Sequence, residues 1–302
     1  MSRSAFAFFV AVVASATRLA QVPPSQTPTG GPRPLWTVST GLAQPESAHY
    51  FLGTVFVSNI NGQTLAKDGN GYITRIADGG KVIGNPWVKG LNAPKGIRGS
   101  GTTLWVADID EVVSIDVREA RITAHIPVAG SSFLNDLAIA PDGTIYVSHS
   151  NEPRIYIVKD GKSSVFVEGS VRDGVPNGLL VDAGRLILGT IGQAPTGGKL
   201  LAFDLQTKQR TQLTTENVGG IDGIEPAEKG AYFVTDVIGR RLLHVASNGK
   251  VTTLSTFDQA CADIGVSPKM EQLVQAGIVF IPFLSASSVA AYDLYPLIRA
   301  AR

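Results

Sequence analysis

Apolar and polar residues alternate along the chain in short segments that are separated by turns rich in glycine and aspartate. The clearest stretch predicts strands at residues 135–140, 144–149, 154–158 and 164–167, with a turn at Pro141-Asp142-Gly143 between the first two. Alternation with a period of two residues and Asp-Gly turns are typical of β-hairpins. The stretch therefore predicts a unit of four antiparallel strands.

This unit recurs along the chain, and each copy begins at a polar residue that precedes its first strand. The six opening residues are Glu46, Lys95, Asn135, Asn177, Asp222 and Asp263. A four-stranded repeat of roughly 40–50 residues is typical of a β-propeller blade. The sequence therefore predicts an all-β fold, a six-bladed β-propeller with four antiparallel strands per blade, which forms a single domain over residues 35–295.

The last repeat has room for only three strands, near residues 264–267, 278–283 and 289–294. The segment 36–40 precedes the first opening residue, in the place where each later blade has the outer strand of its predecessor. We predict that this N-terminal strand completes the last blade, because an open sheet edge favours aggregation. Residues 296–302 are expected to form a C-terminal tail.

The first 20 residues are predicted to be an export signal. Arg3 precedes an apolar run that is too short to cross a bilayer, and Ala14-Ser15-Ala16 has the small residues that signal peptidase recognises. Cleavage is expected after Ala16 or after Ala20, and residues 21–34 are expected to be a flexible leader rich in proline, glycine and threonine. We expect a periplasmic or extracellular protein without stable membrane insertion.

Composition and charge narrow the function classes. The 26 Lys and Arg residues balance 25 Asp and Glu residues, so the chain lacks the basic excess of a nucleic-acid-binding protein. Charged residues make up only 17% of the chain, unlike in a highly charged disordered protein. A single cysteine, Cys261, excludes an intrachain disulfide and a thiolate metal cluster.

We expect the protein to be a monomer that acts on a small molecule.

The repeat also predicts the position of a site. The first strand of each propeller blade lines the central channel, so the opening residues are expected to form a ring at one of its mouths. If each hairpin is continuous, the residues opposite five of the opening residues form a rim around the ring; they are Asn59, Asp108, His149, Thr190 and Asp236.

Carboxylate and amide oxygens suit a hard divalent cation, Ca²⁺ first, with Mg²⁺, Mn²⁺ or Zn²⁺ as alternatives. We therefore predict a metal site at Glu46, Asn135, Asn177 and Asp222. The alternative is that these polar groups cap the channel and hold water.

An ion in the ring can polarise an ester or lactone carbonyl and lower the pKa of bound water. In such a site Lys95 is expected to stabilise an oxyanion or bind a substrate carboxylate. The candidates for moving the proton are Asp222, Asp236 and His149. For His149, a structural hydrogen bond at the end of its strand is the alternative role.

Four segments together resemble the senescence-marker-protein/gluconolactonase/luciferin-regenerating-enzyme family over residues 35–294. They are Pro45-Glu46-Ser47, Phe133-Leu134-Asn135-Asp136, Val175-Pro176-Asn177-Gly178-Leu179 and Ile221-Asp222-Gly223-Ile224. In that family a Glu, two Asn and an Asp from four blades hold a divalent ion, and the Asp also takes part in proton transfer. The resemblance implies the same roles for Glu46, Asn135, Asn177 and Asp222.

The sequence also departs from this family. Lys95 lies in the ring beside the predicted ion, and the arginine-containing sugar-binding pattern of gluconolactonases is absent. We therefore expect a lactone or ester substrate other than gluconolactone.

Two function classes follow from the sequence. The first is a metal-dependent lactone or ester hydrolase. The second is a noncatalytic propeller that binds a peptide or carbohydrate on one face, because residues 91–108 resemble an NHL-type repeat. A strictosidine-synthase-like condensing enzyme, which needs no catalytic metal, is a third possibility. Neither a Gly-x-Ser-x-Gly nor a His-Glu-x-x-His motif is present, so the usual serine-hydrolase and zinc-peptidase signatures are missing.

Overall fold

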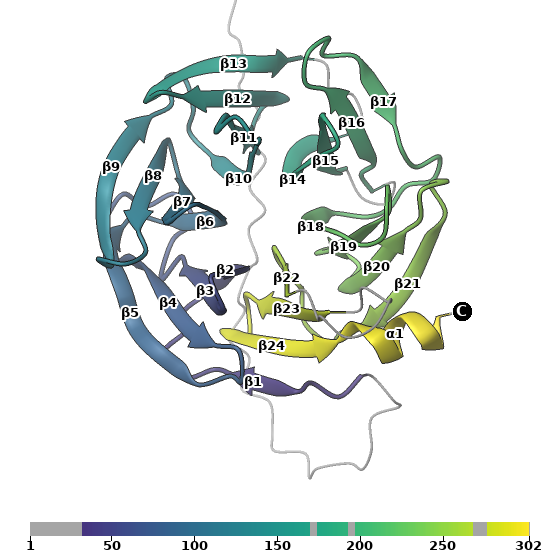
Figure 1. The fold of residues 1–302 in the computed structure, drawn as a ribbon, viewed down its shortest axis with the longest axis horizontal. Coiled ribbons are helices and arrows are strands. Elements are labelled where there is room, and N and C mark those ends of the chain that lie inside the picture. The colour runs from purple at the N-terminus through teal and green to yellow at the C-terminus, as the bar shows by residue number, and fades with distance from the viewer. Residues whose placement is uncertain (1–31, 170–173, 193–196, 268–276, 302) are drawn as a thin grey trace, which may run out of the picture. The chain divides into compact units, whose positions relative to one another are not determined.

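The structure, a computed structural model, describes residues 32–169, 174–192, 197–267 and 277–301. These residues form six four-stranded antiparallel sheets, which are arranged as blades around a central axis (Figure 1). The predicted all-β, six-bladed propeller is thereby confirmed. The predicted signal peptide and most of the predicted leader lie outside the described residues.

Each of the first five blades adds its strands in chain order from the axis outward. Blade 1 consists of β2 (Pro45–Phe51), β3 (Thr54–Asn59), β4 (Gly71–Ala77) and β5 (Val82–Leu91), and blade 2 of β6 (Pro94–Ser100), β7 (Thr103–Asp108), β8 (Glu111–Asp116) and β9 (Arg121–Pro127). Blade 3 consists of β10 (Leu134–Ile139), β11 (Ile145–His149), β12 (Arg154–Lys159) and β13 (Lys162–Glu168). Blade 4 consists of β14 (Val175–Asp182), β15 (Arg185–Ile191), β16 (Leu200–Asp204) and β17 (Arg210–Gln212), and blade 5 of β18 (Ile221–Pro226), β19 (Tyr232–Asp236), β20 (Arg241–Val245) and β21 (Val251–Thr256).

Blade 6 joins the two ends of the propeller. It contains β22 (Gly265–Ser267), β23 (Ile278–Phe283), β24 (Ser288–Asp293) and, on its outer edge, β1 (Trp36–Val38). Strand β1 runs antiparallel to β24, and the Trp36 ring lies 5.7 Å from the Phe280 ring. The predicted closure of the last blade by the N-terminal strand is confirmed.

The hydrophobic core lies between the blades. Six clusters of buried apolar residues each join two neighbouring blades; for example, Phe56 and Ile73 of blade 1 pack with Ile97 and Val106 of blade 2. Fully burying a side chain of this size contributes about 1.5–3 kcal/mol. Packing of one blade against the next therefore stabilises the propeller and fixes the spacing of the inner strands.

A short helix, α1 (Leu294–Ala300), follows β24 in the region where a C-terminal tail was predicted. The Asp293 carboxylate accepts a hydrogen bond from the Tyr295 amide and caps the helix. Leu294 and Leu297 are buried against the apolar residues shared by blades 5 and 6. In the described part of the chain, no helix is both long and apolar enough to cross a membrane.

The inner strands of blades 1 to 5 each contain a β-bulge beside the opening residue. In blade 3, His149 lies opposite Leu134, whereas further along the hairpin Val147 lies opposite Leu137, so one extra residue is inserted between them. The prediction that each rim residue lies directly opposite an opening residue is therefore wrong by one position. It assumed a continuous hairpin, and the bulge shifts the register.

Hydroxyl groups satisfy the backbone amides that the bulges release from the sheet. The Asp136 amide donates to Ser148 Oγ (2.9 Å), the Ser47 amide to Ser58 Oγ (3.0 Å), and the Gly223 amide to Thr235 Oγ1 (2.7 Å). Each hydroxyl belongs to the penultimate residue of the second strand. The bulges are thus supported by specific side chains and hold the opening residues in place.

Replacing Ser148 with alanine is expected to destabilise the protein by about 1–3 kcal/mol, because the buried Asp136 amide loses its acceptor. Chemical denaturation followed by tryptophan fluorescence measures this change. Ser163→Ala is the matched control, since the Ser163 hydroxyl bonds an exposed carbonyl at the surface. Equal stabilities of the two variants would show that the hydroxyl does not support the bulge.

Candidate functional site

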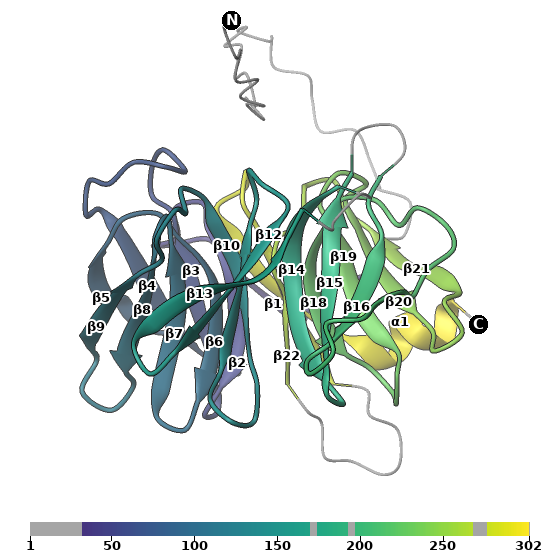
Figure 2. The ribbon, with the colours of Figure 1, turned by 90° about the horizontal axis from the view of Figure 1, so that it is seen from above.

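The six opening residues lie at the same end of the inner strands, and all six are buried. The inner strands run side by side around the axis and start from this end (Figure 2). Glycine permits their close approach. A Cβ atom at Gly178, the residue after Asn177, would lie 2.0 Å from the Asp222 carbonyl oxygen of the next blade.

Hydrogen bonds connect the opening residues of blades 3, 4 and 5. The Asn135 side-chain amide donates to Ser150 Oγ (2.9 Å), and that hydroxyl donates to the Pro176 carbonyl oxygen (3.1 Å), next to Asn177. The Asn177 side-chain amide donates to Asp222 Oδ1 (3.1 Å). Both asparagine side chains therefore have their nitrogen atoms engaged by the protein, which fixes the orientation of their oxygens.

Three oxygens of the ring have no hydrogen-bond partner although they are buried: Glu46 Oε2, Asn135 Oδ1 and Asn177 Oδ1. Leaving a buried oxygen unpaired is costly, and either a hard cation or water can satisfy oxygens of this kind. Within the described ranges, no three His, Cys, Asp or Glu side chains are grouped to hold a metal ion. The two amide oxygens are therefore essential to any ion site here, and with Glu46 and Asp222 they form a donor set that fits Ca²⁺.

Several carboxyl groups lie close together at this end of the axis. Burial, together with the charges of Asp222 and Asp263, raises the pKa of Glu46 well above its ordinary value. Burial and the charge of Asp263 raise the pKa of Asp222 to about 8. These carboxyl groups oppose one another's ionisation, and a divalent cation bound among them would favour their ionised forms.

The raised pKa of Asp222 predicts how stability depends on pH. The unfolded chain loses this proton near 3.8, whereas the folded protein keeps it until about 8. Because the folded state binds more protons between these values, the stability of the ion-free protein is expected to fall as the pH rises through this interval.

Thermal melts in the presence of a chelator, taken across this pH interval, measure the effect. Asp222→Asn should flatten the slope, and Ca²⁺ added to the unmodified protein should reverse the loss by stabilising the ionised carboxylates. Identical slopes for the unmodified protein and the variant would contradict the assignment.

Lys95 is the cation of the ring. Its Nζ donates to the carbonyl oxygens of Ala93 and Thr64, each at 3.0 Å, and lies 5.0 Å from the centre of the Phe133 ring. Burial lowers the pKa of Lys95 to about 8, although the charges of Glu46 and Asp108 act in the opposite direction. The amine is thus held in one place, with Thr64 contributed by the loop between β3 and β4.

The rim residues share a structural role. The Asn59, Asp108, His149 and Asp236 side chains each accept a hydrogen bond from a backbone amide that lies two or three residues before an opening residue. In blade 4, Thr190 Oγ1 instead accepts from the Lys199 amide (2.9 Å). The rim side chains in blades 1, 2, 3 and 5 therefore fasten the loops that lead into the inner strands.

Both of the rim residues that we predict as proton carriers take part in this role, although Nδ1 of His149 is buried without a hydrogen-bond partner in the described part of the chain. His149 Nε2 accepts from the Ser132 amide (3.0 Å), and burial lowers the pKa of His149. Asp236 accepts from the Gly220 and Gly239 amides and pairs with Arg241. Asp222, by contrast, accepts a hydrogen bond from Asn177, whose own side-chain oxygen is one of the three unpaired oxygens.

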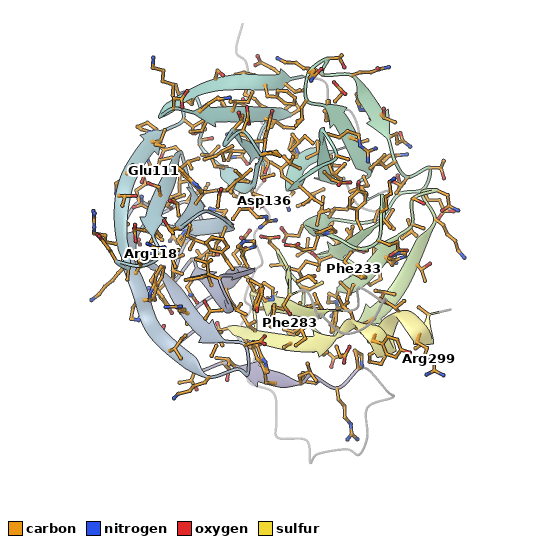
Figure 3. All side chains as sticks on the ribbon, in the orientation of Figure 1. Glu111, Arg118, Asp136, Phe233, Phe283 and Arg299 are labelled. Atoms are coloured by element: carbon orange, nitrogen blue, oxygen red, sulfur yellow. The ribbon has the colours of Figure 1, made fainter. Side chains whose placement is uncertain are left out.

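Sequence reasoning missed a buried ion cluster that consists of Arg98, Asp136 and Asp263. Figure 3 shows Asp136 near the axis, and the Arg98 guanidinium pairs with both carboxylates. The sequence does contain one sign of this cluster. Arg98 is a charged residue three positions after the opening residue Lys95, in a strand of mostly apolar or small residues.

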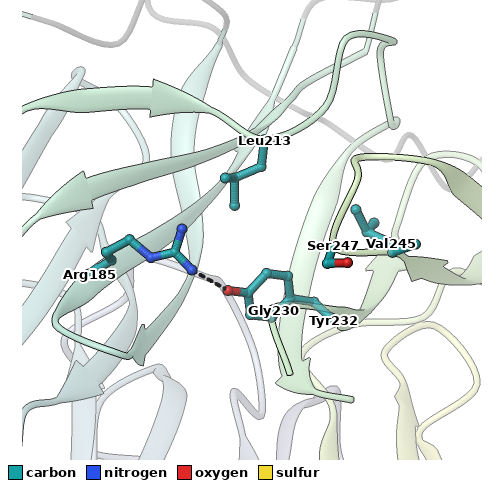
Figure 4. Close-up of a pocket in the computed structure, with 7 residues that line it drawn as sticks. Arg185, Leu213, Gly230, Tyr232, Val245 and Ser247 are labelled. Atoms are coloured by element: carbon teal, nitrogen blue, oxygen red, sulfur yellow. Dashed lines mark hydrogen bonds between the residues drawn. The ribbon is translucent and has the colours of Figure 1, made fainter. Parts of the chain in front are cut away.

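A separate cavity of about 110 Å³ lies between blades 4 and 5, at the opposite end of their strands (Figure 4). Arg185 Nη2 donates to the Tyr232 hydroxyl (3.3 Å), which donates to Asp182 Oδ2 (2.8 Å). Arg185 and Tyr232 of the cavity are thus paired with each other, and no residue that lines the cavity belongs to the ring.

The sequence matches no known protein family and no curated protein. Solved structures with the same fold include a gluconolactonase from Xanthomonas campestris (15% identity, 86% of this chain and 88% of that chain, TM-score 0.64). A structure of a nidogen/laminin complex is also similar, with 16% identity over 76% of this chain and 88% of that chain and a TM-score of 0.63. A streptogramin B lyase shares 11% identity over 85% of this chain and 96% of that chain, with a TM-score of 0.58. At these identities the likeness establishes the propeller fold alone.

Proposed function

We propose that the protein is a metal-dependent hydrolase of a lactone or ester, with its site at the ring of opening residues. The observation that carries this proposal is the presence of three buried, unpaired oxygens, on Glu46, Asn135 and Asn177, beside the Asp222 carboxylate. Four residues from four blades would hold the ion. Similarity to a gluconolactonase structure supports the proposal at the level of the fold.

A divalent cation bound there supplies Lewis acidity to the substrate carbonyl. Asp222 accepts the proton of the attacking water, because its carboxylate lies beside Asn177 and the bound cation would keep it ionised. Lys95, held by Ala93 and Thr64, stabilises the negative charge that develops on the carbonyl oxygen. His149 and Asp236 keep the surrounding loops in position.

Metal analysis of the purified protein, combined with a panel of lactones and aryl esters, tests the proposal. One bound divalent ion per chain is expected, and chelation should abolish hydrolysis until Ca²⁺ is restored. Asn177→Ala should lose both the ion and the activity, whereas Asn248→Ala, a change in an exposed turn, should lose neither. Failure to bind any ion in millimolar Ca²⁺ would refute the metal site.

A noncatalytic binding propeller is the second candidate, and the similarity to a propeller in a nidogen/laminin complex favours it. In this case the ring would still bind an ion, but no substrate of the panel would be hydrolysed at a rate above that of the chelated protein. An ion-dependent interaction with a peptide or carbohydrate would then be expected. The same two measurements therefore separate the candidates.

Replacing Lys95 with methionine should separate ion binding from catalysis. Removal of a neighbouring positive charge is expected to tighten Ca²⁺ binding, while hydrolysis falls about 10²–10³-fold because the developing charge loses its partner. Calorimetric titration and steady-state kinetics measure the two effects. If hydrolysis is unchanged, Lys95 serves only to fasten the loop at Thr64.

A further inference from the structure

Arg98 lies in β6, three residues after the opening residue Lys95, and is buried at 7% exposure. Its Nη1 donates to Asp263 Oδ2 (2.8 Å), and its Nη2 donates to Asp263 Oδ1 and Asp136 Oδ2 (both 3.2 Å). A third group, the Ile97 carbonyl oxygen, also accepts from Nη1 (2.7 Å). One guanidinium thus joins blade 2 to two carboxylates that belong to blades 3 and 6.

Asp136 links Arg98 to the backbone beside Asn135 and Asn177, two of the residues with unpaired oxygens. It directly follows Asn135 in the chain, and its Oδ2 also accepts the Leu179 amide of blade 4 (2.7 Å), two residues after Asn177. Its Oδ1 accepts the Leu137 amide (2.7 Å). The backbone beside both asparagines is therefore tied to the carboxylate that Arg98 holds.

Asp263 links Arg98 to the backbone around Glu46, the third residue with an unpaired oxygen. Its backbone amide donates to the Glu46 carbonyl oxygen (2.9 Å), and its carbonyl oxygen accepts the Ala48 amide (3.1 Å). Its Oδ2 also accepts the Ser47 hydroxyl (2.5 Å). The backbone on both sides of Glu46 is thereby fixed to Asp263.

We propose that Arg98 is a positioning residue that sets the spacing of the unpaired oxygens of Glu46, Asn135 and Asn177. The inference rests on the proposed function in so far as these oxygens bind a cation. A planar guanidinium bonds two carboxylates in a fixed geometry, which a lysine ammonium cannot reproduce. The geometry of Arg98, and not only its charge, is then required for ion binding.

Ion titration of Arg98→Lys tests this requirement, because the variant keeps the buried charge but loses the planar pair of nitrogen donors that bonds both carboxylates. Calorimetry with Ca²⁺ and luminescence of bound Tb³⁺ should both show an affinity about 10–100-fold lower than that of the unmodified protein. Arg185→Lys, which makes the same change in an arginine that contacts Asp182 and Tyr232 at the opposite end of the strands, is the matched control and should leave the affinity unchanged. Unchanged affinity in Arg98→Lys, or an equal loss in both variants, would overturn the proposal.

Two further measurements keep the test independent of folding defects and of the proposed function. Methylguanidinium added to Arg98→Ala should restore the affinity if the lost geometry is the cause. Hydrogen exchange at the Leu179 and Asp263 amides should be faster in Arg98→Lys than in the unmodified protein, with or without an ion. If the unmodified protein binds no ion, the proposed function fails, and unchanged exchange at these amides would refute the positioning role by itself.

Discussion

Asp222→Asn is expected to abolish hydrolysis and to make the ion-free protein more stable at neutral pH. The asparagine keeps an oxygen that accepts the Asn177 amide, so the hydrogen bond of the folded state survives. It removes the proton acceptor and one negative charge, and loss of a general base alone lowers the rate about 10²–10⁴-fold. The same substitution relieves the cost of ionising a buried carboxylate beside Asp263.

Kinetics on the most active lactone or ester and thermal melts in chelator measure the two effects. Asp160→Asn, a change in the exposed turn between β12 and β13, is the control and should leave both the activity and the stability unchanged. Opposite signs for activity and stability are characteristic of a residue that is retained for function at the expense of the fold. A variant that is inactive and also less stable would indicate that Asp222 is structural.

Deleting residues 34–40 is expected to lower the melting temperature sharply and to promote aggregation. The deletion removes β1, which pairs with β24 and buries Val38 and part of Trp36 against blade 6. Loss of large buried side chains of this kind costs about 3–5 kcal/mol, which corresponds to a shift on the order of 10 °C in a protein of this size. The exposed edge of β24 would be free to pair with another molecule.

Differential scanning calorimetry and light scattering follow the two consequences. A truncation that ends before residue 34 retains β1 and should melt like the full chain. The closure would contribute little to stability if both truncations melted at the same temperature.

The sequence was sufficient to predict the architecture because the repeat is regular. Each blade begins with a polar residue and continues in alternating segments, so the number of blades and the closing strand followed from the pattern. Packing between blades enforces this regularity, since each inner strand must fit against two neighbours. The same regularity identified six buried opening residues at one end of the axis.

The register could not be predicted, and Arg98 was missed for the same reason. In a continuous strand, Lys95 and Ile97 would share a face, and Arg98 would face away from the axis. The bulge inserts one residue, so Ile97 packs between blades 1 and 2 while Arg98 turns to Asp136 and Asp263. The hydroxyls of Ser58, Ser148 and Thr235 were the available sign of these bulges, but their role depends on contacts that alternation alone does not specify.

The closing strand also constrains how the propeller folds. Trp36 pairs with Ala291, so the sheet that joins the two ends of the chain forms only after nearly the whole polypeptide has been synthesised. Pairings so distant in sequence carry a high entropic cost of loop closure and slow the final step of folding. During synthesis β1 therefore has no partner strand, and the propeller stays unclosed until β24 has been made.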